Sequence, residues 1–171
     1  MTRKMILSPL NDGDLLYVAR NMREADKQEI YATRWSENPN VLVDDCMRAS
    51  SGAGAYTVMA GLEKPIAVLG AAQPWPGVFD VWCFATPDFN KIAFSLTKHI
   101  RRVMIPLLIE RGAHRAHCRS LASHTEAHEW LKMLGARERM GVLKDWGKGG
   151  EDFLMFQWHL EDFAQQSEAA A

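Results

Sequence analysis

The chain has 171 residues, of which 47% are hydrophobic and 24% charged, and its formal net charge is −1. This composition is that of one globular domain with a buried core, and the near-zero charge excludes a global field that would recruit nucleic acid or anionic membranes. No apolar run approaches the roughly 20 residues of a membrane-spanning helix, so we expect no membrane partner.

The N-terminal segment predicts a strand followed by a helix. Residues 5–10 are a short apolar stretch ended by Pro9, which suits a first strand. Polar residues at 11–14 offer helix caps, and apolar residues recur at helical spacing over 15–22.

A second helix is predicted from a capping pattern. Asp26 followed by Glu29 resembles a capping box, with Asp26 as the cap of a helix that ends at about Trp35. Pro39 lies in the segment that breaks this helix, and residues 41–49 could form one more short helix.

Three strands are predicted next, over residues 56–62, 66–72 and 78–85, after a flexible loop at 50–54. The first two are close enough for an antiparallel hairpin, and residues 73–77 connect the second strand to the third. Both faces of the third strand are largely apolar, which predicts a central strand covered on both sides.

The following segment predicts a helix, a strand and another helix. Residues 90–111 form a long helix with an apolar stripe, in which Pro106 should produce a kink. A short strand covers residues 114–120, and residues 124–134 form a second helix with Ser123 as its cap.

This order predicts a parallel pair between the central strand and the strand at 114–120. In such sheets ligands bind beyond the carboxyl ends of the strands, here near Ala85 and Ser120. Two strands, 138–143 and 153–158, complete a single domain over residues 1–160, and residues 161–171 read as a flexible tail.

The order of these elements over about residues 5–159 resembles the GNAT superfamily of N-acetyltransferases. The resemblance implies an α/β (α+β) fold with a mixed, mostly antiparallel central sheet of about six or seven strands flanked by helices. Its most specific part is residues 120–136, at the second predicted helix.

GNAT proteins often carry an Asn in this helix, an Ala three residues later, then Leu-Tyr and a final Gly-Phe. Aligned on Gly135, Ala127 matches the alanine and His124 stands in place of the Asn. Trp130 and Leu131 stand in place of Leu-Tyr, so the tyrosine that often acts as general acid is replaced by Leu131.

The cofactor implied by the resemblance is acetyl-CoA, used as a co-substrate. In active members a glycine-containing loop before the long helix holds the pyrophosphate on backbone N–H groups. Here residues 86–93 contain no glycine; Lys91 could meet a phosphate, but Asp88 would repel it. The resemblance places these residues near acetyl-CoA: Phe84, Ala85, Thr86, Asn90, Lys91, Ile92, Ala93, His124, Ala127 and Leu131.

Acetyl transfer to an amine needs a base that takes the proton of the amine. Asp80 is the best-placed candidate, because it shares a strand face with Trp82 and Phe84 beside the expected cleft. The alternative is a structural carboxylate paired with a neighbour. Glu29 is a second candidate base, on the helix that borders the acceptor site in GNAT proteins, and its alternative is a capping carboxylate.

The histidines and cysteines predict no metal site and no nucleophile. His124 either contacts the cofactor or is a solvated residue of the first helical turn; His124 and His128 are one turn apart, but no other ligands converge on them. Cys46, Cys83 and Cys118 lack CxxC spacing, which favours buried thiols in a reducing cytoplasm.

We therefore expect an N-acyltransferase that transfers acetyl from acetyl-CoA to an amine of a protein or small molecule. A second resemblance, to a small GNAT-like family of tailed phages, implies a catalytically weakened binding protein: a virion component, or a modulator of a host protein in the host cytoplasm. The basic face of Lys98, Arg101 and Arg102 lacks interleaved aromatic residues, so nucleic acid is not an expected partner. GNAT-like proteins are often dimers, which implies a homodimer.

Overall fold

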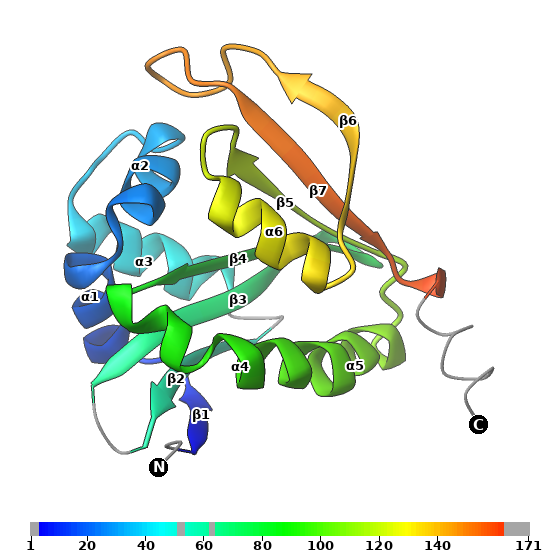
Figure 1. Ribbon diagram of the computed structural model, residues 1–171, viewed down its shortest axis with the longest axis horizontal. Helices are drawn as coiled ribbons and strands as arrows, with labels where there is room; N and C mark the ends of the chain where they lie inside the picture. The colour runs from blue at the N-terminus through cyan, green and yellow to red at the C-terminus, as the bar shows by residue number, and fades with distance from the viewer. Residues whose placement is uncertain (1–3, 51–53, 62–63, 163–171) are drawn as a thin grey trace.

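The computed structural model describes residues 4–50, 54–61 and 64–162 of the chain (Figure 1). Most of the predicted flexible loop, residues 51–53, and the predicted tail from residue 163 onward lie outside the described residues. Within the described residues, no helix has the length and apolar character needed to cross a membrane.

The core of the fold is a seven-stranded sheet in the order β1-β2-β3-β4-β5-β7-β6. One neighbouring pair, β4 with β5, is parallel, and the other pairs are antiparallel. The predicted mixed, mostly antiparallel sheet is confirmed, and so is the pairing of the two strands that end near Ala85 and Ser120. The strands are β1 Met5–Pro9, β2 Ala55–Ala60, β3 Pro65–Trp75, β4 Val78–Ala85, β5 Arg115–Leu121, β6 Arg137–Leu143 and β7 Phe153–His159.

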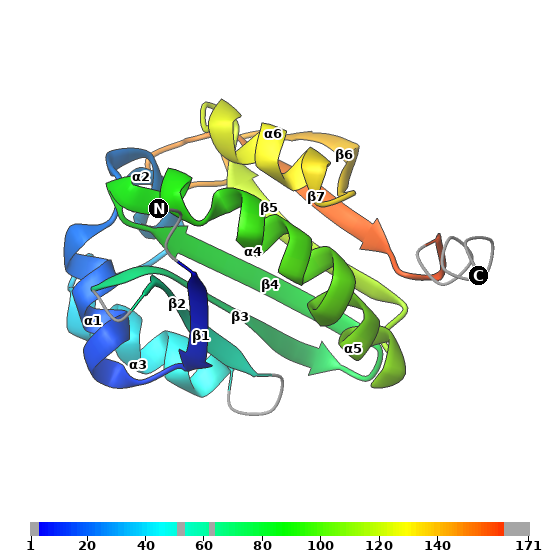
Figure 2. The same cartoon turned by 60° about the horizontal axis from the view of Figure 1, so that its bottom comes forward.

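Helices cover both faces of this sheet. The helical elements are α1 Asp12–Asn21, α2 Glu24–Ala32, α3 Pro39–Ala49, the 3-10 helix η1 Pro87–Lys91, α4 Ala93–His99, the π-helical turn η2 Ile100–Met104, α5 Ile105–Glu110 and α6 Thr125–Met133. Figure 2 shows α4 and α5 running alongside β4, and Figure 1 shows α6 in front of β5 and β7.

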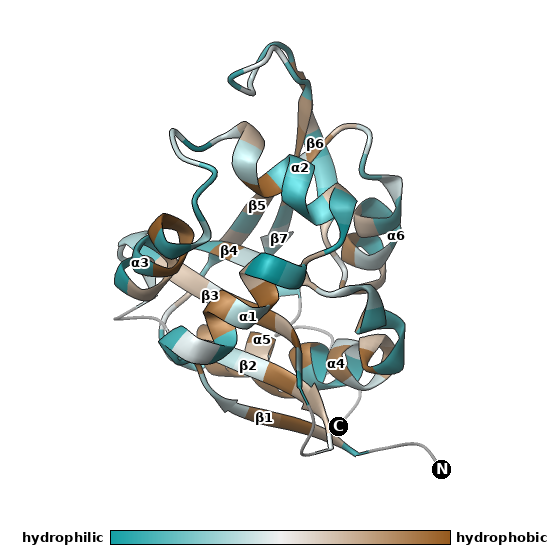
Figure 3. Ribbon diagram, turned by 90° about the vertical axis from the view of Figure 1, so that its left-hand side faces the viewer, coloured by the Kyte–Doolittle hydropathy of each residue, from teal (hydrophilic) through white to brown (hydrophobic). Residues whose placement is uncertain are grey.

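The alternation of β4 side chains separates two hydrophobic clusters. Phe79 packs with Ile105 and Leu131, on the face covered by α5 and α6. Phe84 packs with residues of α1 and α3 on the opposite face, which confirms β4 as a strand covered on both sides. In Figure 3, brown hydrophobic segments of α1 and α4 lie beside the strands, whereas α2 and β6 are largely teal and hydrophilic.

Two predicted helix caps are wrong. Helix α2 begins at Glu24 with Arg23 as its N-cap, so Asp26 lies inside the first turn and is buried. Helix α6 begins at Thr125 with His124 at the N-cap and no side-chain cap bond, so Ser123 is not the cap. Both assignments relied on local spacing, whereas Asp26 and His124 make their contacts with distant parts of the chain.

The predicted long helix at 90–111 is divided rather than simply kinked. The wider π turn η2 lies directly before α5, where the N–H of Ile105 donates to the carbonyl of Ile100. Pro106 has no N–H, and its ring would clash with the carbonyl four residues earlier in a regular helix. The π turn relieves this conflict.

Strand β3 is also longer than predicted. It continues to Trp75, which pairs with Val78 across a register shift that follows Ala72. Pro74 is tolerated in the strand because the shift removes the regular ladder there.

Candidate active site

Strands β4 and β5 separate near the middle of the sheet. Their parallel pairing covers three positions and ends where Asp80 pairs with His117. Beyond that point β4 continues to Ala85 and β5 to Leu121, and Figure 1 shows the two strands diverging toward α2. A sheet that opens in this way exposes backbone N–H and C=O groups inside the molecule, where a ligand can use them.

A cavity of about 440 Å³ lies at this opening. Its walls include Asp80 and Trp82, from the α1 and α3 face of the sheet. They also include Ala116, Leu131 and Trp158, which belong to the hydrophobic cluster beneath α5 and α6. The cavity therefore has walls on both faces of the sheet, which suits a site where two substrates meet.

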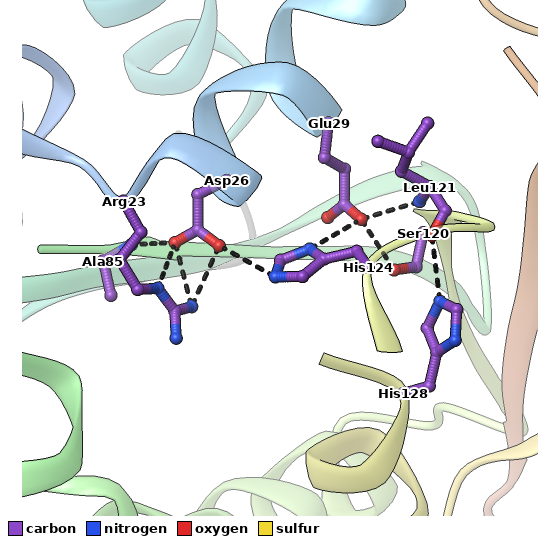
Figure 4. A network of polar contacts seen from close by, with 8 residues as sticks. All are labelled: Arg23, Asp26, Glu29, Ala85, Ser120, Leu121, His124 and His128. Atoms are coloured by element: carbon purple, nitrogen blue, oxygen red, sulfur yellow. Dashed lines mark hydrogen bonds and ion pairs between the residues drawn. The ribbon is translucent and has the colours of Figure 1, made fainter. Parts of the chain in front are cut away.

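A buried polar network closes one end of the opening (Figure 4). The imidazole of His124, at the start of α6, lies between Asp26 and Glu29 of α2. Its Nδ1 is 3.1 Å from Glu29 Oε2, and its Nε2 is 3.4 Å from Asp26 Oδ1. The second contact is long for a hydrogen bond, so it is better described as an ion pair.

Glu29 joins α2 to the end of β5. The hydroxyl of Ser120 donates to Glu29 Oε2 at 2.6 Å, and the backbone N–H of Leu121 donates to the same oxygen at 2.7 Å. The sequence-based alternative of a capping carboxylate is wrong, because these donors lie on β5 and α6 rather than at the start of α2.

Asp26 joins α2 to the end of β4 in a similar way. The backbone N–H of Ala85 donates to Asp26 Oδ2 at 2.8 Å, and the Arg23 guanidinium donates to both carboxylate oxygens. The backbone N–H of Arg23 donates to the carbonyl of Ala85 at 2.9 Å. Helix α2 is thus fastened to both separated strands.

Charge and burial act in opposite directions in this network. Burial raises the pKa of Asp26, and the charge and hydrogen bonds of Arg23 and Ala85 only partly oppose this. Burial disfavours the protonated form of His124, but the hydrogen bond and charge of Glu29, with the charge of Asp26, give a net rise in the His124 pKa. The arrangement therefore favours the protonated form of His124 beside Glu29.

His124 is therefore not the solvated residue that one sequence-based reading allowed; it is 5% exposed. His128, one turn later, is also buried, and its Nε2 is 3.0 Å from the carbonyl of Leu121. Burial lowers the pKa of His128. Among the described residues no group of three or more potential ligands could hold a metal ion.

Asp80 lies at the mouth of the opening, on the face predicted for it. Its Oδ2 forms an ion pair with Arg119 of β5 at 3.0 Å, and the Asp80 side chain is 35% exposed. The guanidinium of Arg119 also lies over the ring of Trp146, 5.8 Å from its centre. This ion pair matches the sequence-based alternative of a carboxylate paired with a neighbour, and Asp80 nevertheless remains accessible in the cavity wall.

The cavity brings together some of the predicted site residues and not others. Asp80, Glu29, His124, Ala127 and Leu131 all line it. The remaining predicted residues are not among its walls: Phe84, Ala85, Thr86, Asn90, Lys91, Ile92 and Ala93. Residues 84–86 are buried in the fold, and the segment after them folds back on itself.

That segment forms a compact 3-10 turn. The N–H groups of Phe89 and Ile92 donate to carbonyls of the same segment, at Thr86 and Phe89. Asp88 and Lys91 form an ion pair at 2.9 Å and are both more than half exposed.

Three residues of the site were not predicted as site residues from sequence: Arg23, Asp26 and Arg119. Ser120 was expected only as the strand end near which a ligand binds. The spacing of Arg23 and Asp26 could have indicated their ion pair, because residues three apart are neighbours on a helix. Nothing in the local sequence indicates that Ser120 meets Glu29, which is 91 positions away.

The thiols in the cavity wall are not activated. Burial raises the pKa of Cys83 to about 12 and also raises that of Cys118, so both are protonated at neutral pH. Cys46 is buried, and burial raises its pKa to about 11. The predicted burial holds for Cys46, whereas Cys83 and Cys118 are only partly buried in the cavity wall.

No family model matches this sequence, and no curated protein matches it either. Solved structures of GNAT acetyltransferases share its fold. An acetyltransferase of the GNAT family from Bacillus anthracis aligns with a TM-score of 0.68 and 14% identity, over 94% of this chain and 99% of the other. A variant of the spermidine N-acetyltransferase SpeG from Vibrio cholerae aligns with a TM-score of 0.69 and 13% identity, over 95% of this chain and 98% of the other.

Proposed function

We propose that this protein is an N-acetyltransferase that uses acetyl-CoA to acetylate an amine. The observation that carries this proposal is the separation of β4 and β5 around a cavity with walls on both faces of the sheet. A thioester that enters from one side and an amine that enters from the other would meet at the open edge of β4. The shared fold with GNAT acetyltransferases supports the same conclusion.

The open edge of β4 supplies the groups that would bind the acetyl donor. Ala85 directs its N–H and C=O toward Asp26 and Arg23, away from β3. Because these groups alternate between the two edges of a strand, those of Cys83 lie on the same edge, beyond the last position where β4 pairs with β5. An N–H group on this edge would polarise a carbonyl during transfer.

The cavity also suits the pantetheine arm of acetyl-CoA. Its walls under α4 to α6 are largely apolar and include Ile105, Ala127, Trp130 and Leu131. Acetyl-CoA would supply the acetyl thioester that these residues and the edge of β4 hold. The residues of the chain then have to orient the amine and accept its proton.

Asp80 is the residue we assign as the base. It is accessible in the cavity wall, and Arg119 fixes its orientation through one oxygen. Glu29 is less suited to proton transfer, because its Oε2 already accepts hydrogen bonds from Ser120, Leu121 and His124. We therefore assign Glu29 a positioning role, in which it holds α2 against β5.

The charges of the cavity favour an acceptor with a single amine over a polycation. A spermidine acetyltransferase is among the similar structures, but in this cavity each acidic residue except Glu126 is paired with a basic one. Asp80 pairs with Arg119, and Asp45 with Arg34 at 3.0 Å. Paired carboxylates have little remaining attraction for several positive charges.

The test is acetyl transfer to a panel of primary amines, with the release of free CoA thiol as the measurement. Monoamines and peptides with a free amine are compared with spermidine and putrescine. CoA release that depends on amine and is lost in Asp80→Asn supports the proposal. Binding of acetyl-CoA without transfer to any amine would contradict it.

A second function, binding without catalysis, is favoured by one observation. The segment that should hold the pyrophosphate has no glycine and uses the N–H groups of Phe89 and Ile92 internally. In that case the chain acts through a protein partner, such as a host protein if it is phage-encoded. Absence of any CoA binding in calorimetry, with a folded protein, would support this second function.

A further inference from the structure

The segment after β4 does not offer an anion-binding backbone. The N–H of Thr86 donates to the carbonyl of Ile66, those of Phe89 and Ile92 donate within the segment, and Pro87 has no N–H. Four of its seven positions from 86 to 92 thus have no backbone N–H to offer a ligand. If a phosphate group binds at this end of the cavity, another part of the chain has to hold it.

Arg23 is fixed beside this segment. The backbone N–H of Arg23 donates to the carbonyl of Ala85. The side chain of Arg23 donates to the carboxylate of Asp26, which in turn accepts a bond from the backbone N–H of Ala85. Its guanidinium lies 4.8 Å from the centre of the Phe89 ring. The last residue of β4 and the first aromatic side chain after it therefore fix the position of the guanidinium.

The guanidinium keeps donors for a ligand. Its bonds to Asp26 use Nε and Nη2, and no described residue accepts a bond from Nη1. The Arg23 side chain is 25% exposed and lines the cavity next to Phe89 and Trp130. Asp26 is almost fully buried beneath it, so an incoming anion would meet the guanidinium first.

We infer that Arg23 is the phosphate-binding residue of this site, and that its ligand is the pyrophosphate of a CoA-type acyl donor. This inference rests on the proposed acetyl transfer and names the residue that replaces the missing backbone cradle. Arginine suits this role because its planar N–H groups match phosphate oxygens in pairs. Contact with the Phe89 ring and partial burial strengthen the interaction relative to a fully solvated side chain.

The test compares two ligands that share the thiol arm, CoA and pantetheine, of which only CoA carries phosphates. Titration calorimetry measures both with the wild-type chain, Arg23→Gln and the double variant Arg23→Gln/Asp26→Asn. The double variant removes the carboxylate charge that the single change leaves buried without its partner. Arg20→Gln, at an exposed arginine on neighbouring α1, is the matched control.

We expect Arg23→Gln and the double variant to bind CoA about tenfold to hundredfold more weakly, as for a lost hydrogen bond to a charged group. Pantetheine affinity should change less than about twofold in the same variants. Arg20→Gln should bind both ligands as the wild type does.

Three outcomes would overturn the inference. If the wild type binds CoA no more tightly than pantetheine, there is no phosphate subsite. Equal weakening of both ligands in the two Arg23 variants would show that Arg23 acts through the fold. If the wild type binds neither ligand, the proposed function itself fails, and that result is distinct from the first two.

Discussion

Glu29→Gln removes the charge that joins α2 to β5 and keeps the size of the side chain. Its Oε2 accepts hydrogen bonds from Ser120, Leu121 and His124 at 2.6, 2.7 and 3.1 Å, and the side chain is only 15% exposed. A hydrogen bond to a charged group contributes about 1.5–3 kcal/mol, and bonds to one oxygen are not additive. We expect the variant to lose about 2–4 kcal/mol of unfolding free energy at about pH 6.

The loss depends on pH because His124 titrates. Burial opposes its protonation, but Glu29 and Asp26 together raise its pKa. A raised histidine pKa adds stability that is fully present below the unfolded-state pKa of about 6.5 and is lost as pH rises through the folded-state pKa. Glu29→Gln removes most of the stability that the raised His124 pKa contributes. The difference in unfolding free energy between the wild type and Glu29→Gln therefore shrinks toward about pH 9. The raised pKa of Asp26 affects the wild type and the variant alike, so its contribution largely cancels in the difference of their unfolding free energies.

Urea unfolding followed by circular dichroism, at both pH values, measures this difference. Glu24→Gln is the matched control, because Glu24 lies on the same helix and is exposed. A difference below about 0.5 kcal/mol at both pH values, or one that grows with pH, would refute the role assigned to the network.

Three further predictions test other parts of the structure. Asp80→Asn should lower kcat by about 10²–10⁴-fold with little change in acetyl-CoA affinity; unchanged kcat in steady-state assays would remove Asp80 as the base. Gly77→Ala should lower the thermal midpoint, because Gly77 has φ of +81° and an added Cβ would collide with the His114 ring; a midpoint equal to wild type would contradict the turn geometry. Cys83 and Cys118 should resist alkylation by iodoacetamide at neutral pH, since burial raises both thiol pKa values, and rapid labelling of the folded protein seen by mass spectrometry would contradict this.

The fold followed from the sequence because its signals are local and repeated. Alternation in 78–85 predicted a central strand, and the helix after it predicted a crossover to a parallel neighbour. Both predictions are confirmed by the pairing of β4 with β5. The position of Asp80 beside the opening followed from the same alternation, because a strand residue's face is set by its parity.

The polar network could not be predicted in the same way. Asp26 and Glu29 have the spacing of a capping box, but their partners, Ala85 and Ser120, are 59 and 91 positions away. Local patterns describe the start of a helix, whereas these contacts depend on how α2 docks on the sheet. His124 shows the same limitation: the sequence allowed either a cofactor contact or a solvated residue, and neither alternative includes its burial between Asp26 and Glu29.

The early end of the β4–β5 pairing divides the chain into two halves, residues 4–110 and 115–159. Among the described residues they are joined by three positions of the sheet ladder, by the network around His124, and by contacts such as the bond from Trp130 to Thr97. A ligand bound in the opening would contact both halves and fix their positions relative to each other. Ligand binding is then coupled to unfolding. Once the ligand concentration exceeds Kd, each further tenfold increase adds about 1.4 kcal/mol to the free energy of unfolding.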